Sequence, residues 1–273
     1  MSRVSVNGAE LWYQFTGSGD TVVQVGGAVS AHEGYATITP ILSEHYRVLD
    51  YDHRGYGLSD RPRQQYTFDT WCDDLAALMD VLGIESAHVH GGSMGSFIAV
   101  AFAAKYPERV HKLILGAGAV GKCDRMGVLQ FRVWQHLARS YGVASIELAE
   151  ELLTKAFSRE YLAGEAGGEA ALVEMQEVTA RNVSVEVFVD ACQAMIDTDV
   201  TDRLAQIRAP ALVMVGSEDV LTPLDAGPDG VGARAVAESL PNARLVVFEG
   251  SGHGHYIEKA EASAQTILDF LSS

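Results

Sequence analysis

The sequence contains few cysteines and no long hydrophobic run. Cys72, Cys123 and Cys192 are odd in number and widely separated, and none belongs to a Cys-x-x-Cys pair or to a Cys/His spacing that binds metal. This pattern argues against a disulfide framework and against a zinc site. No window approaches about 18 consecutive apolar residues, and the N-terminus lacks the apolar region of a signal peptide. We therefore expect no membrane span and a cytoplasmic protein with reduced thiols.

Basic residues are also scarce. Lysine and arginine total 20 against 36 aspartate and glutamate residues, which gives a formal net charge of −16. Nucleic acids and anionic membrane surfaces select for a basic face, so neither is expected as a partner. The acidity is explained more simply as a means of keeping the protein soluble. The sequence leaves open whether the protein is a monomer or a homo-oligomer.

Hydrophobic residues, in contrast, make up 48% of the 273 residues, so the chain can bury a large core. Short apolar runs alternate with longer helical patterns such as 68–83, 96–110 and 256–271. The later runs are continuously apolar, which is typical of parallel strands buried on both faces. The predicted strands are residues 4–6, 11–15, 22–25, 48–50, 87–90, 113–115, 212–215 and 245–248. This alternation predicts an α/β fold with a mostly parallel eight-stranded sheet flanked by helices.

The alternation is interrupted between residues 122 and 207, where the pattern is almost wholly helical. The strand pattern then resumes in "IRAPALVMVG" (207–216). We therefore predict one α/β core, formed by residues 1–121 and 208–273, into which residues 122–207 are inserted as a helical cap.

A short glycine-rich segment carries the main chemical signal. Gly91-Gly92-Ser93-Met94-Gly95 fits the pattern Gly-x-Ser-x-Gly, and it lies between a predicted strand and a predicted helix. This is the context of a nucleophile elbow. In such a turn the serine takes a strained backbone conformation, and the flanking glycines leave room for the chain to reverse. The pattern predicts that Ser93 is held out as a nucleophile.

Partners for such a serine follow later in the chain. A serine hydroxyl becomes an effective nucleophile when a base accepts its proton and a carboxylate orients that base. Asp219 lies just beyond a predicted buried strand, where sites on parallel sheets are found, and His253 follows the last predicted strand in a glycine-flanked loop. The order Ser, Asp, His is the one expected where the serine lies on this kind of elbow. Ser93, Asp219 and His253 are therefore predicted to form a catalytic triad.

Five segments resemble those of α/β-hydrolases, and the resemblance covers essentially the whole chain. They are "YDHRGYGLSD" (51–60), "LGIESAHVHGGSMG" (82–95), "PERVHKLIL" (107–115), "PALVMVGSEDVLTP" (210–223) and "GSGHGHYIE" (250–258). Within this superfamily the arrangement is similar to 3-oxoadipate enol-lactonase-like esterases and lactonases. The local likeness lies in residues 191–223, where the predicted cap rejoins the core.

The resemblance also bears on the choice of base and acid. The family usually has a Gly-His pair with a glutamate five positions after the histidine, and His253 and Glu258 match that spacing. His253 is therefore favoured over His255, which is expected to be a loop or pocket residue. Asp219 matches the family's acid in its Gly-x-x-Asp-x-x-x-Pro setting. Because some relatives take the acid from the loop after the sixth strand, Asp124 is the alternative.

One loop departs from the family pattern. The family commonly has a His-Gly pair after the third strand, and the N–H of the next residue contributes to the oxyanion hole. Here the segment is "VQVGGAVSAH" (23–32), in which Val25 takes the place of the histidine. The resemblance then implies Gly27 as one backbone donor, with Ala28 as the alternative. Met94, directly after the nucleophile, is the other implied donor.

The activity that the resemblance implies is hydrolysis of a carboxylic ester or lactone through an acyl-enzyme, on a small-molecule substrate. No metal or organic cofactor is needed for this chemistry. Similar scaffolds use the same triad for C–C bond hydrolysis, lyase chemistry or acyl transfer, and the fold alone does not choose among them. A ligand receptor with little turnover is the alternative outside the enzymes.

Other polar and aromatic residues receive less specific expectations. Residues 52–54 and His90 are expected to be structural, with His90 packed and hydrogen-bonded in the core. His32, from the oxyanion loop, and Trp134, from the cap, are candidates for lining the pocket.

Overall fold

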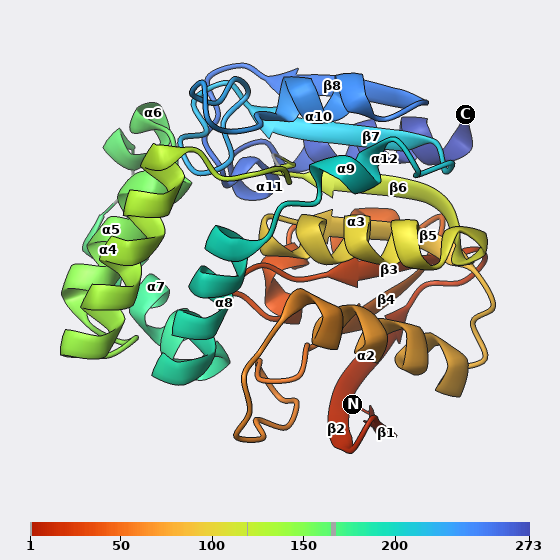
Figure 1. The fold of residues 1–273 in the computed structure, drawn as a ribbon, viewed down its shortest axis with the longest axis horizontal. Coiled ribbons are helices and arrows are strands. Elements are labelled where there is room, and N and C mark those ends of the chain that lie inside the picture. Colours follow the sequence, from red (N-terminus) through yellow and green to blue (C-terminus); the bar gives the residue numbers. More distant parts are fainter. Residues whose placement is uncertain (1, 119, 165–167) are drawn as a thin grey trace.

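The core of the protein is a single twisted sheet (Figure 1). In the computed structural model, which describes residues 2–118, 120–164 and 168–273, eight strands have the order β1-β2-β4-β3-β5-β6-β7-β8. β1 and β2 are antiparallel, as are β2 and β4, whereas β4, β3 and β5 to β8 run parallel. The strands are Ser2–Val6, Ala9–Thr16, Thr21–Val25, Arg47–Tyr51, Ala87–Gly92, Val110–Gly116, Ala211–Gly216 and Ala243–Phe248, numbered β1 to β8. The predicted fold class and each predicted strand are confirmed.

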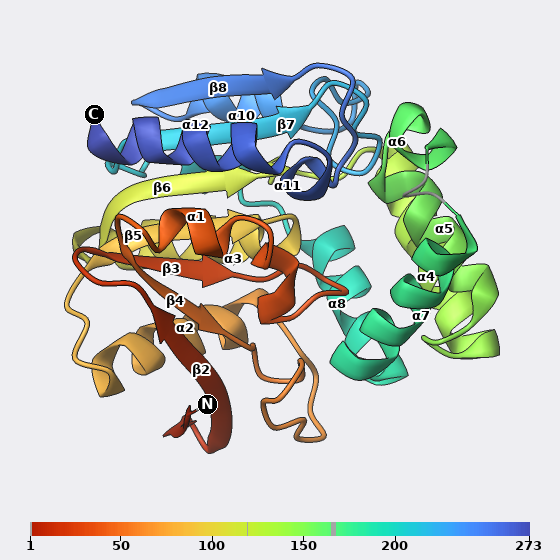
Figure 2. The same cartoon turned by 180° about the vertical axis from the view of Figure 1, so that it is seen from behind.

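Helices cover both faces of the sheet (Figures 1 and 2). One face carries α2 (Phe68–Val81), α3 (Met94–Lys105), α9 (Thr201–Leu204) and α10 (Ala233–Ser239). The other carries α1 (Thr39–Leu42), α11 (His255–Glu258) and α12 (Ala260–Ser272). Residues 94–103 of α3 are all buried, which explains why this helix is apolar on every side. Two short 3₁₀ helices, η1 (His32–Tyr35) and η2 (Pro107–Arg109), complete the core.

Two predicted helices are shorter than their sequence patterns suggest. The helix expected over 96–110 ends at Lys105, because Tyr106 precedes Pro107 and a residue before proline disfavours helical geometry. The helix expected over 256–271 is interrupted at Lys259, whose φ of −134° and ψ of 46° separate α11 from α12. The short α11 belongs to the loop that carries His253.

A separate group of helices, here called the cap helices, lies beyond the carboxyl ends of the parallel strands (Figure 1). They are α4 (Arg125–Tyr141), α5 (Ile146–Ala156), α6 (Arg159–Ala163), α7 (Glu169–Asn182) and α8 (Val185–Asp197). Between residues 122 and 207 the described residues form helices and no strand. α9, at the end of that interval, contacts α3 and α10 of the core. None of the helices in the described ranges is long and apolar enough to cross a membrane.

Hydrogen bonds join the cap helices to core loops at the carboxyl edge of the sheet, and two of these connections involve glutamates of the core. The side-chain amide of Asn182, at the end of α7, donates to Glu33 Oε1 at 2.6 Å. At the other place, the Ser158 N–H donates to Glu258 Oε1 at 3.1 Å, and the Ser158 hydroxyl donates to the second oxygen of the same carboxylate. The cap is therefore tied both to the loop after β3 and to the loop after β8.

Candidate active site

Ser93 lies in a sharp turn between β5 and α3. Its φ of 53° and ψ of −121° are values that few residues other than glycine adopt. The Ser93 N–H donates to the carbonyl of Gly116 on β6 at 2.8 Å, which fixes the turn to the neighbouring strand. A Cβ atom on Gly95 would lie 1.9 Å from the carbonyl oxygen of Val25, and one on Gly91 would lie 2.3 Å from that of Gly95. The turn therefore has no room for a side chain at either glycine.

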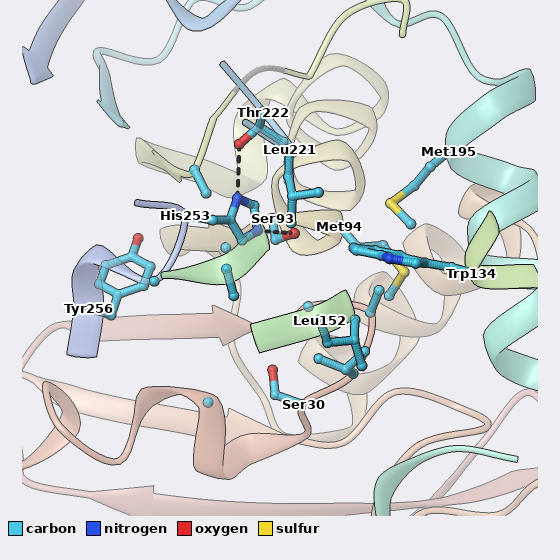
Figure 3. Close-up of a pocket in the computed structure, with 18 of the residues that line it drawn as sticks. Ser30, Ser93, Met94, Trp134, Leu152, Met195, Leu221, Thr222, His253 and Tyr256 are labelled. Carbon is cyan, nitrogen blue, oxygen red and sulfur yellow. Dashed lines mark hydrogen bonds between the residues drawn. The ribbon is translucent and has the colours of Figure 1, made fainter. Parts of the chain in front are cut away.

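The structure brings Ser93, His253 and Asp219 into one hydrogen-bonded line. Ser93 Oγ is 2.8 Å from His253 Nε2 (Figure 3), and His253 Nδ1 is 2.9 Å from Asp219 Oδ2. Asp219 follows β7 and His253 follows β8, so all three residues meet at the carboxyl edge of the sheet. When Nδ1–H donates to the carboxylate, Nε2 is left to accept the serine proton. This is the arrangement of a nucleophile, a general base and an orienting acid.

Asp219 is held as a carboxylate by its surroundings. Its side chain has no exposed surface. Oδ1 accepts the N–H groups of Leu221 and Thr222, both at 2.9 Å, and Oδ2 accepts the Thr222 hydroxyl at 2.7 Å. Burial raises the pKa of Asp219, but attraction to His253 and the hydrogen bonds from His253 and Thr222 outweigh burial and hold the pKa below its usual range. The ionised carboxylate can therefore stabilise a positive charge on His253.

The loop that carries His253 is fixed by Glu258, the glutamate five positions later. Glu258 Oε1 accepts the N–H of Gly252 at 2.9 Å, in addition to its bonds from Ser158 of the cap. The N–H of Gly254 donates to the carbonyl of Ala156 at 2.6 Å. Hydrogen bonds to Gly252 and Gly254 thus hold the loop on both sides of the histidine.

The implied oxyanion donors lie next to Ser93. Gly27, Ala28 and Met94 line the same cavity as Ser93. A Cβ atom on Gly27 would lie 3.6 Å from the Cβ of Ser93, so the Gly27 backbone passes close to the nucleophile. Met94 is the first residue of α3, and its N–H therefore has no acceptor within the helix. The assignment of these donors, with Ala28 as the alternative to Gly27, stays a prediction.

A cavity of about 170 Å³ reaches Ser93 between the core and the cap helices. Trp134 lines it, as expected, and lies beside Met195 on the cap side of Ser93 in Figure 3. Most of the wall is apolar. The cap helices contribute Phe131, Trp134, Leu152, Ala156, Met175 and Met195. The arrangement can therefore present a carbonyl to Ser93 while it buries an apolar group beside it.

Asp124, the alternative acid, has another role in the structure. It caps the N-terminus of α4, where Oδ1 accepts the N–H of Gly127 at 2.8 Å. Oδ2 accepts the N–H of Gly227 at 2.9 Å, from the long loop after β7. Burial raises the pKa of Asp124, but these backbone hydrogen bonds outweigh burial and lower it. Asp124 joins a cap helix to a core loop, whereas Asp219 is the carboxylate that reaches His253.

The expectation that His32 lines the cavity is wrong, and of the two places expected for His255, loop or pocket, the structure shows the loop. Neither His32 nor His255 is among the described residues that line the cavity. His32 turns away from it, with Nδ1 2.9 Å from Asp52 Oδ1. His255 is the first residue of α11, which directs its ring into the core, where it stacks on Phe248 at a centroid distance of 4.9 Å. Tyr256, the next residue, lines the cavity instead.

The expected structural roles of His90 and of residues 52–54 agree with their contacts. His90 is completely buried, its Nε2 lies 2.6 Å from the Tyr256 hydroxyl, and burial lowers its pKa to about 3. Asp52 accepts the backbone N–H of Leu58 at 2.8 Å. The Arg54 guanidinium makes two hydrogen bonds of 2.7 Å to the two carboxylate oxygens of Asp74.

Thr222 is a site residue that the sequence analysis missed. Its hydroxyl lies 2.7 Å from Asp219 Oδ2 and 3.2 Å from His253 Nδ1, so it contacts both partners of the serine. The one available signal is its position inside the Gly-x-x-Asp-x-x-x-Pro segment, directly before Pro223. Within the described ranges, no group of three or more His, Cys, Asp or Glu residues is arranged to hold a metal ion.

Comparisons with known proteins agree with the fold. The family model described as "Serine aminopeptidase, S33" matches residues 18–260. A 2-hydroxy-6-oxononadienedioate/2-hydroxy-6-oxononatrienedioate hydrolase from Paraburkholderia phymatum is 34% identical, with 98% of this chain and 94% of the relative covered. Among solved structures, an enol-lactonase from Burkholderia xenovorans is 29% identical with a TM-score of 0.87, and the match covers 100% of both chains. A thermophilic esterase from Thermogutta terrifontis is 26% identical with a TM-score of 0.87, over 100% of this chain and 98% of that one. The chain therefore belongs to the α/β-hydrolase family that the matched model describes.

Proposed function

We propose that the protein is a serine hydrolase that cleaves a carboxylic ester or lactone through an acyl-enzyme. The observation that carries the proposal is the line from Ser93 Oγ to His253 Nε2 at 2.8 Å and from His253 Nδ1 to Asp219 Oδ2 at 2.9 Å, open to an apolar cavity. Likeness to an enol-lactonase and to an esterase supports it. A cytoplasmic location is part of the proposal, supported by three cysteines that are free thiols.

In the proposed mechanism, Ser93 Oγ attacks the carbonyl carbon while His253 Nε2 takes the hydroxyl proton. The ionised Asp219 stabilises the resulting imidazolium. The N–H groups of Met94 and Gly27 receive the negative charge that develops on the carbonyl oxygen, and each such donor contributes about 3 kcal/mol. His253 then gives its proton to the leaving alkoxide. Water, deprotonated by His253, hydrolyses the acyl-serine and restores the free hydroxyl.

A second candidate is hydrolysis of a C–C bond next to a ketone. The observation that favours it is the 34% identical relative from Paraburkholderia phymatum. The substrates in that relative's name are dicarboxylates with a keto group and no ester bond, so their hydrolysis breaks a C–C bond. The bond that is cleaved distinguishes the two candidates: the first releases an alcohol from an ester or opens a lactone, whereas the second converts the C–C bond next to the ketone into a carboxylic acid and a new C–H bond.

The test of the main proposal is labelling of the purified protein with a fluorophosphonate probe, together with turnover of p-nitrophenyl butyrate. We expect one probe per chain, attached to Ser93, in the wild type. Ser93→Ala and His253→Ala should lose labelling and at least about 10⁴-fold in kcat/KM. Ser30→Ala is the matched control, because Ser30 lines the same cavity and should leave Ser93 labelled. Turnover that survives in folded Ser93→Ala, or a folded wild type that takes up no probe, would refute the nucleophile assignment.

A further inference from the structure

The cavity wall carries almost no positive charge. Among the described residues that line it, none is lysine or arginine, and His253 is the one basic side chain. Both nitrogens of His253 are engaged, one by Ser93 and the other by Asp219. A carboxylate on a bound substrate would therefore find no cation to pair with. Taking an unpaired carboxylate out of water costs several kcal/mol.

The tyrosine and threonine hydroxyls in the wall do not replace the missing cation, because they already bond to the protein. The Tyr35 hydroxyl donates to the carbonyl of Val25 at 2.7 Å, and the Tyr256 hydroxyl lies 2.6 Å from His90 Nε2. The Thr222 hydroxyl is held by Asp219. Ser30 also lines the cavity, and its hydroxyl makes no hydrogen bond within the described ranges, but it is a single neutral donor and does not compensate the full charge of a carboxylate.

The indole N–H of Trp134 is a buried donor in the cavity wall, and it has no hydrogen-bond partner in the described structure. Trp134 is 3% exposed, and its ring extends from α4 toward Ser93 (Figure 3). A single neutral N–H suits one carbonyl or ether oxygen. It does not compensate the full charge of a carboxylate, which takes several donors when buried.

The size of the cavity limits the group that it can hold. Its volume is about 170 Å³. An apolar protein cavity of roughly 150 Å³ binds benzene. The cavity beside Ser93 therefore holds an acyl group of about that size, such as a benzoyl or pentanoyl group. The net charge of −16 also acts against the approach of anionic substrates.

From this chemistry we propose that the enzyme selects esters or lactones with a neutral, apolar acyl part of about the size of a benzene ring, and rejects acyl parts that carry a carboxylate. The inference rests on the proposed ester or lactone hydrolysis. It separates this chain from the Paraburkholderia phymatum relative, whose named substrates are dicarboxylates.

The first test compares three p-nitrophenyl esters that differ at the end of the acyl chain. They are the pentanoate, the mono-ester of glutaric acid, and the same glutarate with its free carboxylate methylated. Spontaneous hydrolysis is subtracted with Ser93→Ala. We expect kcat/KM for the pentanoate to exceed that for the anionic glutarate by about 100-fold or more, and the methylated glutarate to stay within about tenfold of the pentanoate. An anionic glutarate within tenfold of the pentanoate, or a methylated glutarate as poor as the anion, would overturn the inference.

The second test supplies the missing cation. Met175 lines the cavity from α7 and is only half-buried, so a lysine there can fold with its ammonium near the cavity. Met175→Lys should lower the preference for pentanoate over anionic glutarate by about tenfold or more. Met175→Gln, polar but neutral, is the matched control and should keep the wild-type preference. An unchanged preference in folded Met175→Lys would contradict the reasoning.

A third measurement does not depend on turnover. Thermal unfolding of Ser93→Ala at pH 8 is followed with added methyl pentanoate or monomethyl glutarate, whose carboxylate lies at the far end of the acyl chain. Methyl pentanoate should raise Tm, and monomethyl glutarate at the same concentration should not. If methyl pentanoate stabilises the protein while no ester is hydrolysed, the hydrolase proposal fails and the selectivity of the cavity stands. If monomethyl glutarate stabilises equally, the selectivity fails whatever the turnover.

Discussion

Replacing Gly95 with alanine adds one methyl group at the tightest point of the turn that holds Ser93. The new Cβ would lie 1.9 Å from the carbonyl oxygen of Val25, whereas ordinary contacts begin at 3.4 Å. It would also lie 2.7 Å from the carbonyl oxygen of Gly26. Both neighbours are backbone atoms, so no side-chain rotation can relieve the clash. The end of β3 or the start of α3 must move by about 1.5 Å, the difference between those two distances.

The expected cost has two parts. Overpacking of this kind lowers the free energy of unfolding by about 1–3 kcal/mol. The displaced backbone also leads directly to Gly27, an implied oxyanion donor, and loss of one such donor lowers kcat by about 10²- to 10³-fold. Gly95→Ala should therefore unfold at lower urea concentration and lose at least about 100-fold in kcat on p-nitrophenyl butyrate.

The matched control is Gly127→Ala, in the first turn of α4. The nearest atoms to a Cβ at Gly127 lie at 3.6 Å, and its φ is not in the left-handed region. Alanine there should raise the free energy of unfolding by up to about 1 kcal/mol, because it restricts the unfolded chain. If Gly95→Ala unfolds at the wild-type urea concentration and keeps the wild-type kcat, the steric account of the elbow is refuted.

Two further predictions concern Thr222 and the buried histidines. Thr222→Val removes a hydroxyl that contacts both Asp219 and His253, so kcat/KM should fall about fivefold, the effect of losing about 1 kcal/mol. Thr222→Ser, which keeps the hydroxyl, should match the wild type, and a valine variant as active as the serine variant would contradict this. Burial lowers the pKa of His90 and of His255 to about 3, so below about pH 6.5 the unfolded chain binds protons that the folded chain does not. The free energy of unfolding should then fall as the pH drops from about 6.5 toward 3, by about 1.4 kcal/mol per pH unit for each histidine. In urea titrations at pH 7, 6 and 5, the free energy of unfolding of His90→Gln should change less with pH than that of the wild type.

The strands and the turn at Ser93 could be predicted from the sequence because their causes are local. A strand buried on both faces needs a continuous apolar run, and β7 supplies it in "ALVMVG" (211–216), where every residue is buried. Gly91 and Gly95 mark the turn because the chain around them leaves no space for a side chain. The positions of Asp219 and His253 follow from the ends of β7 and β8.

The orientation of single side chains in the site could not be predicted in the same way. His255 and Tyr256 are adjacent, and which of them faces the cavity depends on how the one-turn helix α11 is rotated. That rotation is set by tertiary contacts, such as the hydrogen bonds of Glu258 to Ser158 and Gly252. His32 was a candidate for lining the cavity because it follows the oxyanion loop, but its ring bonds to Asp52, 20 positions further along the chain. For the contact of Thr222 with both Asp219 and His253, the position of Thr222 inside the Gly-x-x-Asp-x-x-x-Pro segment is the one signal in the sequence.

The bonds between Ser158 and Glu258 bear on how substrate range can change in this family. A chimaeric protein that took its whole cap from a relative would also replace residues 156–158. These residues pack closely against the glycines of the His253 loop, since a Cβ on Gly252 would lie 2.8 Å from the Ser158 nitrogen. Such a graft would disturb the histidine before it altered specificity. The wall contributed by α4 and α8, in contrast, has no such bond to the His253 loop among the described residues. Substitutions in α4 and α8 are therefore the simplest route to a new substrate specificity. Residues 156–158 can be exchanged only together with the loop that carries His253.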